Sequence, residues 1–563
     1  MVAIVADDVL ALQRLYHWET TAPDRVALTQ PIGGGEVRDY TWRDVLDQSR
    51  RMAAHLQSLG LQPRDRVGIL SKNTAHWLMS DFAIWLAGGV SVPLYPTLAV
   101  GTIRQILEHS ESKLLFLGKL DGWDRVRAGV PTNVVCISLP LSQDEVKKSY
   151  PRWDDIIAKT APLEGEPVRP GESLATIVYT SGTTGTPKGV MWSFAAFARQ
   201  MQALLRRLRV NSSTRLLSYL PLSHIAERVV TEHTQLAVGA RTYFSESLET
   251  FSADLQHARP TFFLAVPRLW IKFQQGVLAR VPSEQFNRLL RPPNVESTLG
   301  KQILTALGLD QCNDAWTSAA PMPPELLHWY AKIGLHISEA YGMTEIGATH
   351  LTGRTEQAFG TVGLPLDGVQ CRLESSSGEI QIKCPWTMIG YYKAPEVTRQ
   401  TVTDDGWVHT GDKGAVDALG NLMITGRVKD LFKTSKGEYV APAPIEHKIV
   451  MHAAVEACCV TGANLAQPIG LAMLNEAAAK KSADPSGRIE LEASLTEHLT
   501  ALNVTLDPHE RLGCLVLMIE AWTVDNDLVT PTFKVKRNRI EDVFAMQYEN
   551  WVGVGKQVVW HDK

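Results

Sequence analysis

The feature that most restricts the fold is a recurring alternation of apolar helices with short strands rich in β-branched residues. Helices are predicted at 50–61 and 77–88, and the strands that follow them at 66–70 and 90–94. Further strands of this kind are predicted at 113–117, 133–139, 216–220, 240–244 and 261–266. Such alternation is typical of parallel sheets covered by helices, so we predict an α/β fold with two doubly wound α/β subdomains.

The pattern changes after Val362. Short strands at 369–373, 378–384, 407–408, 414–416 and 422–424 are separated by Gly, Asp and Ser turns. This spacing predicts an antiparallel, β-barrel-like subdomain. A charged stretch at 427–430 then precedes a smaller region of mixed helices and strands. We therefore predict a large N-terminal domain at 1–426 and a small α+β C-terminal domain at 427–563.

Composition narrows the class of protein without indicating its chemistry. The 563 residues are 45% hydrophobic and 21% charged, with a net charge of −4. This is ordinary globular usage with no general electrostatic attraction for nucleic acid or anionic lipid. The longest apolar stretch, near 82–92, is too short to span a bilayer, and the acidic N-terminus is unlike a signal peptide. We expect a cytoplasmic protein without a nucleic-acid partner and with at most peripheral membrane contact.

The most informative motif runs from Ile177 to Met191, where an apolar strand enters a loop of small and hydroxyl residues. The glycines of this loop allow close backbone approach, and successive N–H groups and hydroxyls can surround a polyphosphate. Lys188, near the end of the loop, adds a positive charge. The spacing Gly-x-x-Gly-x-x-Lys differs from that of a Walker A loop.

The segment Tyr179-Thr-Ser-Gly-Thr-Thr-Gly-Thr-Pro-Lys-Gly189 resembles the phosphate-loop signature of the adenylate-forming superfamily. This superfamily includes acyl-CoA synthetases, adenylation domains of peptide synthetases and beetle luciferases. The resemblance extends from about residue 15 to about residue 545, with further motifs in the same order. It implies that ATP is bound by Thr180, Ser181, Gly182, Thr183, Thr184 and Gly185, that Lys188 contacts the phosphates, and that Thr184 also binds Mg²⁺.

A second motif lies at Ser338-Glu-Ala-Tyr-Gly-Met-Thr-Glu345. A tyrosine followed by glycine offers a flat ring and a bare backbone to a purine, and Glu345 offers a hard anionic ligand to Mg²⁺. The resemblance implies that Ala340, Tyr341 and Gly342 line the adenine site, that Thr344 contacts phosphate and that Glu345 holds Mg²⁺. It also places the turn Ser318-Ala-Ala-Pro321, with Ala319 and Ala320, beside the adenine and the acyl channel. Ala319 stands where the family more often has glycine.

Four further residues take roles from the same resemblance. His224 in Pro221-Leu-Ser-His224 matches the histidine that closes over the carboxylate site. Asp412 of Thr-Gly-Asp matches the ribose ligand, a task that carboxylates perform in other nucleotide sites, and Arg427 assists it. Lys429, two residues later, matches the hinge of a mobile C-terminal domain.

The C-terminal segment Thr530-Pro-Thr-Phe-Lys-Val-Lys-Arg537 resembles the one that carries the family's adenylation lysine, which is Lys534 here. Lys536 and Arg537 are expected on a solvated face or at the border of the CoA phosphates. The resemblance therefore implies a reaction in two steps. A carboxylate attacks ATP to give acyl-AMP and pyrophosphate, and after domain rotation a thiol attacks the acyl-AMP.

Several segments resemble the long-chain fatty acyl-CoA synthetase branch, among them 93–97, 266–270, 395–398 and 433–442. The segment at 191–194 and a shortened stretch between Trp270 and Ser318 depart from that branch. The expected substrate is therefore a medium- or long-chain fatty acid or another bulky hydrophobic acid, with ATP, Mg²⁺ and CoA. The alternatives are an acyl-AMP ligase that loads an acyl carrier protein, an amino-acid adenylation domain and a silent nucleotide-binding homologue. Homodimer formation is left open.

Overall fold

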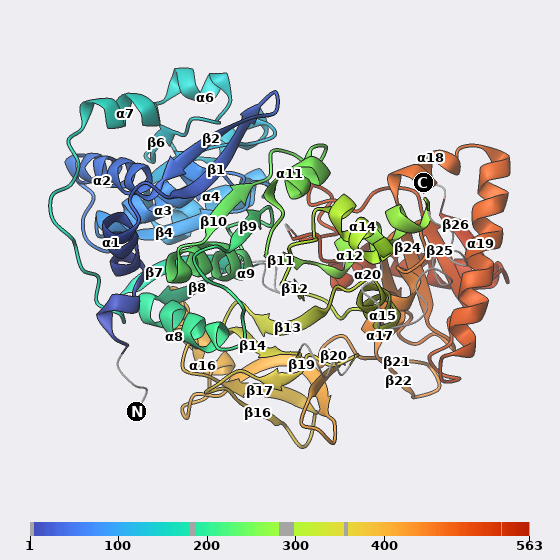
Figure 1. Cartoon of the computed structure of the whole chain (residues 1–563). Helices are drawn as coiled ribbons and strands as arrows, with labels where there is room; N and C mark the ends of the chain where they lie inside the picture. Colours follow the sequence, from blue (N-terminus) through green and yellow to red (C-terminus); the bar gives the residue numbers. More distant parts are fainter. Residues whose placement is uncertain (1–4, 181–186, 281–297, 354–358, 531, 562–563) are drawn as a thin grey trace.

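The computed structural model describes residues 5–180, 187–280, 298–353, 359–530 and 532–561. Its largest sheet is built mainly from the N-terminal half of the chain (Figure 1). Its strand order is β18-β8-β7-β4-β3-β5-β6. The strands are β3 (Arg66–Leu70), β4 (Val90–Leu94), β5 (Ser112–Leu117), β6 (Val135–Ser138), β7 (Leu174–Thr180), β8 (Lys188–Ser193) and β18 (Gly390–Tyr391). Strands β7, β4, β3, β5 and β6 are parallel. Strand β8 pairs antiparallel with β7, and β18 pairs antiparallel with β8. The parallel core confirms the predicted α/β class.

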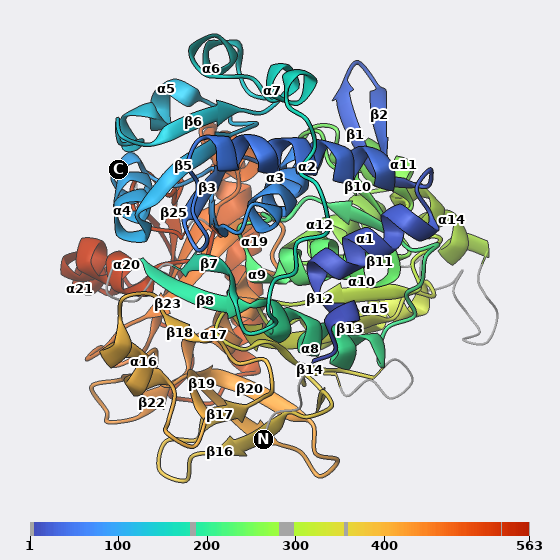
Figure 2. The same ribbon diagram turned by 90° about the vertical axis from the view of Figure 1, so that its left-hand side faces the viewer.

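Helices cover this sheet, and α2 and α3 lie across one of its faces (Figure 2). They are α2 (Trp42–Ser58), α3 (Ala75–Leu86), α4 (Val100–Ser110), α5 (Trp123–Val126), α6 (Asp144–Ser149), α7 (Trp153–Lys159) and α8 (Phe194–Leu205). Helix α2 begins eight residues before the predicted start at residue 50. Thr41 and Asp44 form a capping box that satisfies the first backbone N–H groups there. The apolar periodicity showed only the later part of this helix.

Two further sheets continue the large domain. One has the order β2-β1-β10-β9, with β1 (Val26–Gly33), β2 (Glu36–Thr41), β9 (Arg215–Ser218) and β10 (Arg241–Phe244). The other has the order β11-β12-β13-β14-β15, with β11 (Phe262–Ala265), β12 (Asp314–Thr317), β13 (Ile337–Met343), β14 (Gly347–Leu351) and β15 (Leu364–Pro365). Their helical segments are η1 (Asp7–Val9), α1 (Ala11–Thr21), α9 (Ile225–Glu227), the π-helix η3 (Arg228–His233), α10 (Thr234–Val238), α11 (Phe251–Ala258), α12 (Pro267–Leu278), α14 (Thr298–Leu307) and α15 (Pro324–Lys332). The short segment η2 (Arg127–Gly129) instead follows α5 directly and contacts α4 and α5 of the largest sheet. The strands predicted at 216–220, 240–244 and 261–266 are therefore divided between two sheets.

The predicted antiparallel region is a sheet of order β16-β17-β19-β20, at the bottom of Figure 1. It consists of β16 (Gln370–Leu373), β17 (Glu379–Lys383), β19 (Val408–Val416) and β20 (Leu422–Arg427), with α16 (Pro395–Thr401) nearby. The two strands predicted at 407–408 and 414–416 are one continuous strand. Because β17 and β20 pair with its two edges, β19 continues through Thr410-Gly-Asp412, where the sequence indicated a turn. The turn residues form a bulge in the strand instead: Gly411 has a left-handed φ of +71°, and the register with β17 shifts there.

The C-terminal part forms a separate sheet of order β23-β24-β25-β26, orange to red in Figure 1. Its strands are β23 (Val455–Thr461), β24 (Ile469–Leu474), β25 (Cys514–Met518) and β26 (Val558–His561), preceded by the small hairpin of β21 (Phe432–Lys433) and β22 (Tyr439–Val440). Its helical segments are α17 (Pro442–Ile449), α18 (Glu476–Lys481), α19 (Pro485–Val504), α20 (Arg537–Phe544), η4 (Ala545–Gln547) and α21 (Tyr548–Gly553). Two buried apolar clusters here contain only residues after 430. A small C-terminal domain with its own core follows, although the boundary at residue 426 stays a prediction.

None of the helices in the described segments combines the length and the apolar composition that a bilayer crossing requires.

Candidate active site

The two stems of the predicted phosphate loop are adjacent antiparallel strands. Thr180, the last residue of β7, lies opposite Lys188, the first residue of β8. Ser181, Gly182, Thr183, Thr184 and Gly185 lie outside the described residues. The register therefore brings the hydroxyl of Thr180 and the ammonium of Lys188 to one end of the hairpin.

Glu345 lies beside this hairpin and is 7% exposed. The hydroxyl of Tyr391 donates a hydrogen bond of 2.6 Å to its Oε1, and Lys188 Nζ lies 5.4 Å from the centre of the Tyr391 ring. Burial raises the pKa of Glu345, while the hydrogen bond from Tyr391 and the charges of Lys188 and Arg427 oppose the rise. The buried Glu345 carboxylate therefore has a hydrogen-bond donor in Tyr391 and two positive charges nearby, Lys188 and Arg427.

A second carboxylate, Asp412, is fixed by two donors. The Tyr341 hydroxyl donates to Oδ2 at 2.8 Å, and Arg427 Nε donates to Oδ1 at 2.9 Å. Asp412 and Arg427 face each other across the β19–β20 pair. Burial, and next the charge of Asp412, hold the pKa of Tyr341 well above its usual value, so this phenol remains a donor. The carboxylate is oriented before any ligand arrives.

Lys534 reaches this cluster from the C-terminal domain. Its backbone N–H donates to Thr530 Oγ1 at 3.0 Å and its carbonyl accepts from the Thr530 N–H at 2.8 Å, which closes a tight turn. The residue is exposed to solvent, although its ammonium lies in a protein-rich environment. This burial, and next the charge of Arg427, lower the pKa of Lys534, and Asp412 opposes the change. The predicted lysine therefore lies with the predicted ribose-binding pair.

His224 belongs to the same region. It precedes α9, and its Nδ1 accepts a hydrogen bond of 3.1 Å from the Ala226 N–H. Burial, and next the charge of Lys534, lower the pKa of His224 to about 4. The ring is consequently neutral at pH 7, with its proton on Nε2 because Nδ1 is the acceptor.

The backbone at the predicted adenine site is tightly constrained. A Cβ on Gly342 would lie 1.9 Å from the Gly347 carbonyl oxygen, so only glycine fits there. Thr344 follows β13, and its carbonyl accepts a 2.8 Å hydrogen bond from Trp192 Nε1. Ala319, exposed like Ala320, has a left-handed φ of +74°. The Ser318 hydroxyl ties this turn to the Ala340 carbonyl at 2.8 Å.

Two predicted positions near the domain junction have different outcomes. Lys429 is exposed in the turn directly after β20. The solvated position expected for Arg537 is wrong, because this side chain is enclosed and donates to Glu446 Oε1 at 2.7 Å. Asp430 lies 3.7 Å from the same guanidinium. A guanidinium can be enclosed by protein when carboxylates replace water as the acceptors of its hydrogen bonds.

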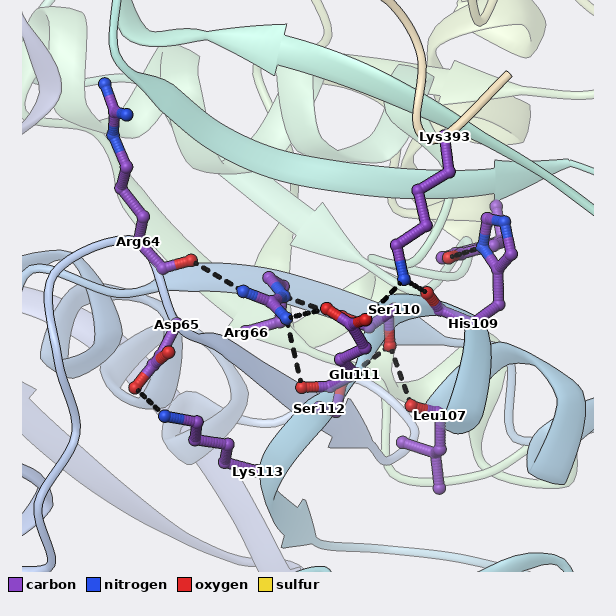
Figure 3. A network of polar contacts seen from close by, with 11 residues as sticks. Arg64, Asp65, Arg66, Leu107, His109, Ser110, Glu111, Ser112, Lys113 and Lys393 are labelled. Atoms are coloured by element: carbon purple, nitrogen blue, oxygen red, sulfur yellow. Dashed lines mark hydrogen bonds and ion pairs between the residues drawn. The ribbon is translucent and has the colours of Figure 1, made fainter.

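Tyr391 is the main site residue that the motifs did not indicate. A network of polar contacts holds its segment (Figure 3): Lys393 Nζ contacts the His109 carbonyl at 3.0 Å and Glu111 Oε1 at 2.8 Å. His109 Nδ1 lies 2.7 Å from the hydroxyl of Tyr179, at the base of the phosphate loop. The paired tyrosines after Gly390 were the available sequence indication. The role of Tyr391 depends on contacts between distant residues: Tyr391 and Glu345 are 46 positions apart, and Lys393 and His109 are 284 positions apart.

Comparison with known proteins agrees with this geometry. The sequence profile of the AMP-binding enzyme family matches residues 15–392, and that of the AMP-binding enzyme C-terminal domain matches residues 429–551. A long-chain-fatty-acid–CoA ligase of Mycobacterium bovis is 28% identical over 96% of each chain. A ligase of the same description from Mus musculus is 28% identical over 72% of this chain and 68% of that one. The adenylation domain of a carboxylic acid reductase from Segniliparus rugosus, solved with AMP and a co-purified carboxylic acid, has the same fold. Its TM-score is 0.80 at 21% identity, covering 98% of this chain and 97% of that one.

Proposed function

The chain belongs to the AMP-binding enzyme family, and on that premise we propose that it joins a carboxylic acid to CoA through an acyl-AMP intermediate. ATP would be cleaved to AMP and pyrophosphate. The observation that carries the proposal is that the charges of Asp412 and Arg427 act on the Lys534 ammonium, which relates motifs more than 100 residues apart. The similarity to long-chain-fatty-acid–CoA ligases supports a medium- or long-chain fatty acid, or another bulky hydrophobic acid, as substrate.

In the first half-reaction a carboxylate oxygen attacks the α-phosphorus of ATP, and pyrophosphate leaves. Negative charge develops on the phosphoryl oxygens and on the leaving group. Lys188 and Lys534 would stabilise this charge from two sides, while Asp412 holds the ribose and Tyr341 lines the adenine site. The neutral His224 could donate from Nε2 to the substrate carboxylate. Positioning and electrostatics, rather than proton transfer, then supply most of the acceleration.

Glu345 fits a magnesium ion that arrives with ATP. No group of three or more acidic, histidine or cysteine side chains suited to hold a metal occurs within the described residues. A single carboxylate is nevertheless enough, because Mg²⁺ is commonly bound through one or two carboxylates together with substrate phosphates and water. Mg²⁺ would neutralise charge on the phosphates. Glu345 would hold it, with the Tyr391 hydroxyl fixing the carboxylate; Thr184 is the proposed second ligand.

In the second half-reaction the thiol of CoA attacks the acyl carbon and AMP leaves. The present arrangement, in which the charge of Asp412 acts on Lys534, suits adenylation. We propose that the C-terminal domain turns about Lys429 to withdraw Lys534 and admit the thiol. Lys429 suits a hinge because it is exposed in a turn between β20 and the C-terminal core.

Separate assays of the half-reactions test this proposal. The protein is incubated with ATP, Mg²⁺ and a panel of carboxylic acids, and pyrophosphate exchange and AMP release are followed with and without CoA. Exchange with CoA-dependent thioester formation is expected. Exchange without a CoA thioester would favour transfer to a carrier protein, and no exchange with any acid would refute the activity.

The variant Lys534→Ala separates the two steps. It should abolish acyl-AMP formation yet leave thiolysis of supplied acyl-AMP largely intact. Lys536→Ala is the matched control, because Lys536 lies in the same segment but pairs with Asp527. Equal loss of both half-reactions in Lys534→Ala would contradict the assignment.

A further inference from the structure

We propose that Asn73 and Glu227 are positioning residues for His224, acting through a buried hydrogen-bond chain beneath the loop that carries it. The inference rests on the proposed function, in which His224 lies at the carboxylate site. Asn73 and Glu227 come from different parts of the fold, and neither belongs to the motifs considered above. Asn73 lies between β3 and α3, and Glu227 ends α9, three residues after His224.

Asn73 fastens the loop at several points. Its Nδ2 donates to the Leu220 carbonyl at 2.6 Å and to Ser218 Oγ at 2.8 Å. Its Oδ1 accepts from the Leu222 N–H at 3.0 Å. Asn73 follows β3 of the largest sheet, whereas its partners lie at and after the end of β9 in another sheet. A side chain near one sheet therefore fixes the loop that follows a strand of a second sheet. Asn73 is 8% exposed, and water competes little for these bonds.

Glu227 completes the chain on the other side of Ser218. Its Oε1 accepts from Ser218 Oγ at 2.8 Å and from Thr231 Oγ1 at 2.9 Å. The Ser218 hydroxyl therefore accepts from Asn73 while donating to Glu227. Glu227 is 2% exposed, and hydrogen bonds of this kind reinforce one another in a dry environment. The chain connects both ends of segment 218–227.

His224 lies inside this fastened segment. Its backbone N–H donates to the Pro221 carbonyl at 2.8 Å, and its Nδ1 accepts from the Ala226 N–H. The ring orientation, and thus the direction of Nε2, follows from the course of residues 221–226. Asn73 fixes this course at Leu222 and Glu227 fixes it at the end of α9. Neither residue needs to contact a substrate to control where Nε2 points.

The first test observes His224 directly and needs no substrate. The protein is labelled with [¹³Cε1]histidine, the His224 resonance is assigned with His224→Gln, and its titration and tautomer are measured. In the intact protein the Nε2–H tautomer and a pKa of about 4 are expected. In Asn73→Ala and Glu227→Ala the pKa should rise by about one unit or more, because the freed ring regains water. An unchanged His224 titration and tautomer in both variants would overturn the inference.

Two further variants separate positioning from general loss of structure. Glu227→Gln retains a carbonyl that can accept from Ser218 and Thr231, so it should preserve the His224 signal that Glu227→Ala loses. Asn475→Ala is the matched control for Asn73→Ala. Asn475 also donates to a backbone carbonyl, that of Ala453 at 2.6 Å, and accepts from a backbone N–H, that of Ala478 at 2.9 Å, but in the C-terminal domain. It should leave His224 unchanged. If Asn73→Ala fails to fold, the comparison of the two Glu227 variants decides the question.

The second test is kinetic. Asn73→Ala should lower kcat/KM for the acid in pyrophosphate exchange by up to about 100-fold, since small displacements in an active site cost this much. In a His224→Ala background it should cost no more than about twofold, because the two changes share one route. An equal cost in both backgrounds would refute positioning through His224. If the intact enzyme exchanges no acid, the proposed function fails, and the histidine titration still decides the inference.

Discussion

Removing the phenolic oxygen of Tyr391 tests how Glu345 is kept ready to bind magnesium. The Tyr391 hydroxyl donates to the buried Glu345 carboxylate at 2.6 Å. This bond favours the ionised carboxylate, whereas burial favours the protonated form and raises its pKa. Tyr391→Phe removes the donor and keeps the ring beneath Lys188. Without this donor, the protonation equilibrium of Glu345 should shift toward the protonated form.

The size of the shift follows from the kind of bond. A hydrogen bond to a charged group contributes about 1.5–3 kcal/mol, and one pKa unit corresponds to about 1.4 kcal/mol. The pKa of Glu345 should therefore rise by roughly one to two further units. Because only the ionised form binds Mg²⁺, activity is lost as the pH falls through this pKa. The acidic limb of the Tyr391→Phe profile should lie at higher pH by the same amount.

The assay is acid-dependent pyrophosphate exchange from about pH 5 to pH 9 at saturating ATP, repeated at several Mg²⁺ concentrations. Added Mg²⁺ should partly restore Tyr391→Phe at low pH, because metal binding opposes protonation. Tyr392→Phe is the matched control. It removes the same atom from the neighbouring tyrosine, whose ring packs against His109 with centroids 5.7 Å apart.

A Tyr391→Phe profile that falls by the same factor at every pH would refute the reasoning. The hydroxyl would then act on the geometry of the site and not on the protonation of Glu345. An equal displacement of the acidic limb in Tyr392→Phe would also contradict it, because that limb would then report a general disturbance of segment 390–393.

Three further substitutions follow from the same geometry. Ala319→Gly should raise the free energy of unfolding by roughly 0.5–1 kcal/mol in urea denaturation. Relief of the strain of a left-handed alanine should outweigh the entropy that glycine gains in the unfolded chain. Tyr341→Phe should raise KM for ATP about tenfold in steady-state kinetics, because Asp412 loses the donor to Oδ2. Arg537→Ala should destabilise the C-terminal domain by about 3–5 kcal/mol in denaturant unfolding, because it leaves Glu446 buried without its partner. The control Arg539→Ala removes an exposed ion pair and should cost less than about 1 kcal/mol.

Much of the fold could be predicted from local patterns. The strands predicted at 66–70 and 90–94 have those bounds in the structure, and those predicted between residues 113 and 384 shift by one or two residues. Apolar runs bounded by turn residues suffice to locate these strands, because a buried strand needs apolar side chains whichever sheet it joins. The failures are local conflicts. Helix α2 begins at a capping box rather than at its apolar stripe, and β19 passes through a Thr-Gly-Asp turn signal because both neighbours pair with it.

The motifs likewise named most of the candidate residues, because loops that face phosphate or metal need glycines, hydroxyls and charges at fixed spacing. They could not give the partners of those residues. Tyr341 and Asp412 are 71 positions apart, and Asn73 is 145 positions from Ser218.

The sequence by itself determined which segments are strands and helices and which residues carry polar chemistry. Only the tertiary structure decided that Lys534 comes within the electrostatic influence of Asp412, that Tyr391 holds Glu345 and that Arg537 is enclosed rather than solvated. The physical reason is that hydrophobic periodicity, capping and turn preferences are local and span a few residues. The environment of a charge, by contrast, is set by every chain segment packed around it.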